Sequence, residues 1–239
     1  MNLYFLVEGR RTEKRVYARW LAHVFPALSQ VERFADVASD HYLIVSGGGQ
    51  PAILDEIGAA LATICERPVI DHLFICLDAE DEDLTAKRAE LDAEITRRRH
   101  DVGADARAPA LRIHAVIQNC CIETWFLGHR KVMKAQPSTS ELARYKAFYD
   151  VRTADPEAMP SIEQTMPRAV FHGQYLRAML AERSPEPRFR YSKRNPGVVT
   201  DHDYLAALGR RCRDTGHLPS LAGLLDTWHA LGGVPDLVG

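Results

Sequence analysis

Carboxylates follow three separate apolar segments of this sequence. The acids are Glu8, Asp78 and Glu123, and the segments are Leu3–Val7, Ile70–Leu77 and Leu111–Ile117. Crowded carboxylates repel one another, and a bound divalent cation usually offsets this repulsion. Mg²⁺ takes hard oxygen ligands from one or two carboxylates together with substrate phosphate. If the segments are parallel strands, their acids share the edge where ligands bind, and the predicted chemistry is metal binding.

Two of these acids, Asp78 and Glu123, also have an ordinary structural interpretation. Asp78 opens the acidic run 78–83, where it would cap a helix or lie in a loop, and Glu123 alone fits an exposed helix position. The shared sheet edge is what favours function, so the prediction depends on the strands.

The turn after the first apolar segment reads Glu-Gly-Arg-Arg-Thr-Glu over residues 8–13. We predict that Gly9 adopts an unusual backbone angle and that Thr12 caps the following helix. Glu13 in the first helical turn suits the helix dipole, and it points back towards Glu8.

A loop rich in arginine and proline spans residues 184–197. Its cations Arg188, Arg190, Lys193 and Arg194 alternate with the aromatic residues Phe189 and Tyr191. Cations bind phosphates and rings stack on bases, so this basic loop is predicted to bind nucleic acid. Arg10 and Arg11, at a helix start, are also placed to meet a phosphate. The alternative is a solvated loop whose aromatic residues anchor it to the rest of the protein.

Charge is unevenly distributed although the net charge is only −2. Residues 1–120 hold 14 Lys/Arg and 19 Asp/Glu, whereas residues 168–213 hold ten and four. This asymmetry suits a protein that holds cations in one place and phosphates in another, with ordinary charge scatter as the alternative.

Strand-like and helix-like segments alternate over the first 118 residues. The predicted strands are Leu3–Val7, Tyr42–Val45, Ile70–Leu77 and Leu111–Ile117, and the predicted helices are Glu13–Phe25, one from Pro51 to Ile64, and Leu84–Arg99. Apolar strands separated by helices indicate a parallel sheet covered on both faces. The later predicted helices are Ile122–Leu127, Ser140–Phe148, Ile162–Ala181, Tyr204–Arg213 and Leu221–Leu231.

The fold class predicted from this pattern is α/β. A mainly parallel, helix-flanked core occupies residues 1–135, and a C-terminal helical cap occupies residues 136–239 and carries the basic loop. The 239 residues, 46% hydrophobic and 26% charged, have ordinary globular composition, which excludes disordered, collagen-like and coiled-coil chains.

Several other classes of protein are not indicated. No apolar run approaches the roughly 18 residues of a membrane span, and Leu3–Val7 is too short for a signal-peptide core. We therefore expect a cytoplasmic protein with no membrane partner. Ser46–Gln50 is glycine-rich but lacks the Gly-Lys-Ser/Thr ending of a P-loop, and the sequence has neither zinc-ligand histidine spacing nor a Gly-x-Ser-x-Gly motif.

The five cysteines include no Cys-x-x-Cys pair. We interpret them as reduced and mostly buried thiols. Adjacent Cys120 and Cys121 are expected to project in different directions and to pack rather than to bind metal.

Four motifs occur in order along the chain. They are LVEGRRTEK at 6–14, FICLDAED at 74–81, NCCIETWFL at 119–127 and YSK at 191–193. Together they resemble Toprim-domain proteins of the RloB-like branch, which is related to the OLD-family nucleases. In that branch the corresponding elements are Glu-Gly-x-x-Thr-Glu, Asp-x-Asp, Asn-Pro-Cys-x-Glu-x-Trp-Phe-Leu and Tyr-x-Lys. This chain departs from the pattern at Glu80, which replaces an Asp, and at Cys120, which replaces the Pro.

The resemblance implies a Toprim-fold, metal-dependent endonuclease of anti-phage defence. By carry-over, one Mg²⁺ or Mn²⁺ ion is held by Glu8, Asp78 and Glu80, a second is held with help from Glu13 and Glu123, and Lys193 faces the scissile phosphate. Two such cations about 4 Å apart activate water and stabilise the leaving oxygen, while the lysine offsets growing negative charge. With a single ion, Glu8 could act as the general base.

Two other functions stay open. Glu80 in place of Asp and the modest net charge are compatible with a non-catalytic module that binds nucleic acid or a partner. The resemblance also allows an effector subunit gated by a partner ATPase encoded nearby. The sequence does not distinguish DNA from RNA, and it leaves the oligomeric state open, a homo-oligomer included.

Overall fold

Five parallel strands form the centre of the first of two compact units. The computed structural model describes residues 1–238. The first unit comprises Met1–Leu77 and Asp83–Ile117, and the second comprises Asp78–Glu82 and the chain from Gln118 onwards. The strands lie in the order β2-β3-β1-β4-β5. They are β1 (Leu3–Val7), β2 (Ser29–Val31), β3 (His41–Ser46), β4 (His72–Asp78) and β5 (Arg112–Gln118).

Strand β1 lies in the middle of the sheet. Val7 pairs with Ser46 of β3 on one side and with Cys76 of β4 on the other. The side chains of β1 are buried on both faces of the sheet, which explains its continuous apolar sequence. The four predicted strands are confirmed to within two residues at their ends. Strand β2 was not predicted, because Ser29–Val31 is short, largely polar and mostly exposed.

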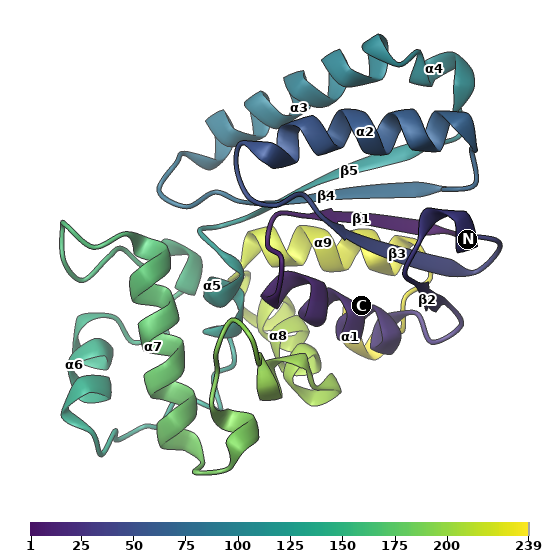
Figure 1. Cartoon of the computed structure of the whole chain (residues 1–239). Helices are drawn as coiled ribbons and strands as arrows, with labels where there is room; N and C mark the ends of the chain where they lie inside the picture. Colours follow the sequence, from purple (N-terminus) through teal and green to yellow (C-terminus); the bar gives the residue numbers. More distant parts are fainter. Residues whose placement is uncertain (239) are drawn as a thin grey trace. The chain divides into compact units, whose positions relative to one another are not determined.

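Helices cover both faces of this sheet. They are α1 (Thr12–Val24), α2 (Ala52–Glu66), α3 (Leu84–Asp101) and the short α4 (Ala104–Arg107). Figure 1 shows α2 and α3 on one face and α1 on the other. The chain thus leaves β1 for one face and leaves β3 and β4 for the opposite face. In α/β proteins, ligands bind beyond the carboxyl ends of the strands at such a change of direction.

The second unit is mainly helical. It contains α5 (Ile122–Phe126), α6 (Ser140–Phe148), α7 (Arg168–Arg183), α8 (His202–Thr215), α9 (Pro219–Ala230) and α10 (Pro235–Val238). Helix α7 packs on α5 and α6, while α8 packs on α9 and α10. Trp125, Tyr175, Tyr204 and Trp228 are among its fully buried side chains.

The predicted helix 162–181 begins later, at Arg168. Pro167 precedes it and disfavours helical geometry in the residue before it, so residues 162–166 stay outside the helix. The change from α/β core to cap near residue 135 remains a prediction. Within residues 1–238, no helix has the length and apolar character that crossing a membrane would demand. All five cysteines are free and buried, as the sequence indicated.

Candidate functional site

The loop after β1 holds the first two predicted metal ligands. Glu8 is half-buried, and its N–H donates to Cys76 O at 3.1 Å, which extends the pairing of β1 with β4. Glu13 is 4% exposed, and its carboxylate accepts the N–H of Gly9. The φ angle of Gly9 is not positive, contrary to the prediction. A Cβ at this position would collide with the Glu13 carboxylate, so a larger residue would require that side chain to move.

The start of α1 differs from the prediction in one respect. Arg11 is the N-cap and no side chain caps the helix, so the predicted capping role of Thr12 is wrong. Arg10 and Arg11 are exposed. A Cβ built on Gly48, in the turn after β3, would lie 3.4 Å from Nη2 of Arg10. An arginine therefore adjoins a glycine-rich turn, an arrangement suited to binding phosphate.

In the second unit, the acidic segment 78–82 is hydrogen-bonded to the end of β5 and the residues that follow it. Ala79 N donates to Gln118 O at 2.9 Å, and Glu80 N donates to Cys120 O at 2.7 Å. Asp78 is half-buried, and Glu80 is exposed with φ of 51°. These backbone bonds bring the acids that follow β4 close to the segment that leads into Glu123.

Glu123 lies in α5 and is 4% exposed, so the alternative of an exposed helix position is wrong. Its Oε1 accepts a 2.8 Å hydrogen bond from the hydroxyl of Tyr191. Tyr191 is itself 5% exposed and meets Phe126 edge-on, with ring centroids 6.0 Å apart. The predicted stacking of this ring on a base is therefore not supported: the ring packs inside the unit and its hydroxyl orients a carboxylate.

The rest of the basic loop lies at the surface. Arg190, Lys193 and Arg194 are exposed. Backbone hydrogen bonds between Ser192 and Asn195, at 2.9 and 3.0 Å, close a tight turn around Lys193 and Arg194. Arg188 pairs with Glu186 at 2.9 Å and lies over the ring of Phe189, so its charge is partly satisfied within the loop.

A basic pocket of about 840 Å³ lies in the second unit, and the sequence did not predict it. Its cationic lining residues are Arg130, Lys131, Lys134, Arg152, Arg183, Arg210 and Arg211, against the acids Asp150 and Asp214. Arg211 is buried and donates to the carbonyls of Gly128, Val151 and Ala154, so it holds the pocket wall together. The lining comes from several segments, so the sequence shows locally only short basic runs such as the one that holds Arg130, Lys131 and Lys134.

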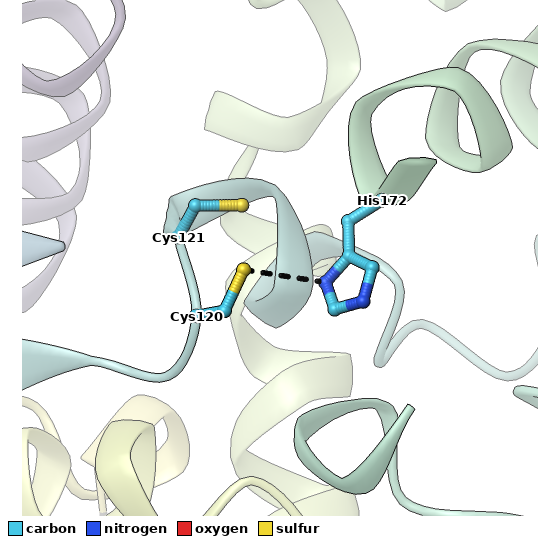
Figure 2. A group of neighbouring side chains, drawn as sticks. All are labelled: Cys120, Cys121 and His172. Carbon is cyan, nitrogen blue, oxygen red and sulfur yellow. Dashed lines mark hydrogen bonds between the residues drawn. The ribbon is translucent and has the colours of Figure 1, made fainter. Parts of the chain in front are cut away.

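Two cysteines and a histidine form a second unpredicted feature of this unit. Ligand atoms of Cys120, Cys121 and His172 all lie within 4.8 Å of one another, and all three residues are buried. Figure 2 shows the two sulfur atoms on the segment before α5, with the imidazole facing them from α7. The expectation that the adjacent cysteines project apart is therefore wrong. His172 lies 52 residues from Cys120, beyond the reach of any local metal-binding pattern.

The surroundings of Cys120 and Cys121 shift their pKa values in opposite directions. The pKa of Cys120 lies below its usual value, chiefly because it accepts a hydrogen bond from Cys121 and also because His172 is near. The pKa of Cys121 is raised by donating that bond and by burial.

Comparison of the chain with models of protein families, with curated proteins and with solved structures finds no match. The resemblance to Toprim proteins thus rests on the four sequence motifs, while the α/β fold with its parallel sheet rests on the structure.

Proposed function

We propose that this protein hydrolyses nucleic-acid phosphodiesters with the help of Mg²⁺ or Mn²⁺. The observation that carries the proposal is the pair of hydrogen bonds from Ala79 N and Glu80 N to Gln118 O and Cys120 O. Through them the acids after β4 adjoin the segment that leads to the buried Glu123. The proposed metal ligands in this unit are the carboxylates of Asp78, Glu80 and Glu123. Carboxylate oxygens are the hard ligands that Mg²⁺ and Mn²⁺ favour.

The remaining proposed ligands, Glu8 and Glu13, lie in and after the turn that follows β1. Glu8 follows β1, and β1 is the neighbour of β4, the strand that ends at Asp78. Glu13 holds the turn after β1 through Gly9. In the proposal, Glu8, Asp78 and Glu80 hold one cation, and Glu13 and Glu123 help to hold a second.

In the proposed reaction, the carboxylates, Tyr191, Lys193 and the exposed cations have different roles. The bound cations supply a water activated for attack and a positive charge for the leaving oxygen. The Tyr191 hydroxyl fixes one oxygen of Glu123, which leaves the other oxygen for a ligand. Lys193 offsets negative charge on the phosphate. The exposed cations of the basic loop and of the basic pocket hold the flanking phosphates.

The test measures cleavage of single- and double-stranded DNA and RNA in Mg²⁺, in Mn²⁺ and in EDTA. We expect metal-dependent cleavage that Glu8→Ala, Asp78→Asn and Glu123→Gln each reduce by about 100-fold or more. Glu66→Gln, at an exposed position of α2, is the matched control and keeps full activity.

Two results would replace this proposal with another. Nucleic-acid binding without turnover, insensitive to EDTA, would identify a non-catalytic binding module. Cleavage that occurs only after a partner ATPase is added would identify a gated effector subunit. Equal cleavage by wild type and Asp78→Asn would exclude the proposed site.

A further inference from the structure

We propose that Cys120, Cys121 and His172 form a buried site for a thiophilic d¹⁰ cation, Zn²⁺ or Cu⁺. Thiolate and imidazole ligands select such ions, whereas Mg²⁺ and Mn²⁺ prefer oxygen. The site is therefore chemically distinct from the carboxylates of the proposed nuclease, and neither proposal depends on the other.

The imidazole of His172 is oriented as in a metal ligand. Its Nε2 lies 3.1 Å from Met159 O, which can only accept, so Nε2 carries the proton and donates. The lone pair is consequently on Nδ1, which lies 3.9 Å from Cys120 Sγ. Metal-bound histidines commonly donate their second N–H to a carbonyl in this manner, which fixes the tautomer and the ring orientation.

Thr124 holds the site in its metal-free arrangement. Its hydroxyl accepts the N–H of Cys120 at 3.2 Å and lies 2.7 Å from Nδ1 of His172, to which it donates. Cation binding requires Nδ1 to exchange this hydroxyl for the ion. The hydroxyl keeps its contacts with the backbone of Cys120 and Cys121, so the exchange leaves the start of α5 intact.

The ligand atoms are close to the spacing that a cation demands. Zn–S bonds of about 2.3 Å and Zn–N bonds of about 2.0 Å place tetrahedral ligands about 3.5–3.8 Å apart. The three atoms already lie within 4.8 Å of one another, so rotation of side chains brings them onto one ion. Two thiolates neutralise Zn²⁺, which limits the cost of burying the charge, while three soft ligands suit Cu⁺.

A purely structural role for the two cysteines explains less of this arrangement than metal binding does. Buried cysteines behave as small apolar residues, and Cys121 also caps the first turn of α5. Neither role calls for an imidazole whose lone pair faces the sulfur atoms. A packing role also predicts that Cys120, Cys121 and Cys212, which is buried as well, respond alike to added metal.

The experiment titrates the full chain, reduced and stripped of metal, with Co²⁺ as an optical probe for Zn²⁺ and, without oxygen, with Cu⁺ against a competing chelator. We expect one equivalent bound, with a thiolate-to-cobalt charge-transfer band that Zn²⁺ abolishes and excess Mg²⁺ leaves unchanged. Cys120→Ala, Cys121→Ala and His172→Gln weaken binding by about tenfold or more, whereas Cys212→Ala does not. Stoichiometric binding of Cu⁺ alone would assign the site to Cu⁺. Absence of binding by all three ions, or affinity unchanged in all three variants, would overturn the proposal.

A second measurement needs no variant. Thiol alkylation of the wild-type chain is followed residue by residue with and without one equivalent of the bound ion. We expect protection of Cys120 and Cys121 but not of Cys65 or Cys212. Equal effects on all four thiols would contradict the site even if each variant failed to fold.

Discussion

The hydroxyl of Tyr191 donates a 2.8 Å hydrogen bond to Oε1 of Glu123, although the two residues are 68 positions apart. Both side chains are almost completely buried, at 5% and 4% exposed. The bond joins the late Tyr-x-Lys element to the glutamate of the third motif within one compact unit. A buried carboxylate needs such a donor, because its desolvation is otherwise uncompensated.

Replacing Tyr191 by Phe tests this relationship. We expect Tyr191→Phe to lower the free energy of unfolding by about 1–3 kcal/mol, since it leaves a buried acceptor without its donor. The proposed cleavage also slows, because one oxygen of Glu123 is no longer held. Urea unfolding and cleavage assays measure the two effects. Tyr145→Phe is the matched control, because it removes a 2.9 Å bond to Glu141, which is exposed and can be hydrated. Equal losses in the two variants would contradict the special role of Tyr191.

Gly9→Ala tests the close approach of Glu13 to the turn after β1. The added Cβ collides with the Glu13 carboxylate, and we expect a loss of about 1–3 kcal/mol in unfolding free energy together with reduced cleavage. Gly223→Ala in α9 is the control, because a Cβ there meets nothing within 4 Å. That change should stabilise the chain by up to about 1 kcal/mol. An unaltered Gly9→Ala protein would show that the turn adapts.

Glu157 predicts a pH dependence of stability. Burial raises its pKa to about 7 although Ser220 donates to it. Between about pH 4.5 and 7 the folded chain therefore keeps a proton that the unfolded chain has released. Stability from this group is greatest below about pH 4.5 and falls as pH rises to 7, by about 1.4 kcal/mol per unit. Unfolding of wild type and Glu157→Gln at several pH values isolates the slope, which the variant should lose. Parallel curves for the two proteins would argue against a raised pKa.

The basic pocket predicts salt-dependent binding of nucleic acid. Lys131→Gln and Arg210→Gln should each weaken binding and reduce the slope of log K against log salt by about 0.7–0.9, the value of one lost phosphate contact. Titrations from low to moderate salt measure the slope. Arg33→Gln changes the net charge equally at an exposed position outside the pocket, where Arg33 pairs with Asp36. If all three variants share one slope, overall charge rather than the pocket governs binding.

Local sequence patterns predicted much of the fold. The strands β1, β3 and β4 contain continuous apolar runs, and β5 is apolar at four of its seven positions. The buried stripe of α1, from Val16 to Val24, repeats at helical spacing. Such patterns predict an element because burial of one face or of a whole strand leaves a periodic signature. The short polar β2 and the late start of α7 at Arg168 were missed, since neither has such a signature.

The sequence by itself determined which acids follow the strands and which loop carries exposed cations. Only the tertiary structure decided that Tyr191 supports Glu123 from inside the unit, that a Cβ at Gly9 would meet the Glu13 carboxylate, and that His172 faces Cys120 and Cys121. It also gathered the cations of the basic pocket from segments far apart in the chain. Glu13 is only four positions from Gly9, but the other three features join residues tens of positions apart. Such contacts arise from packing, and packing leaves no periodic trace in a single sequence.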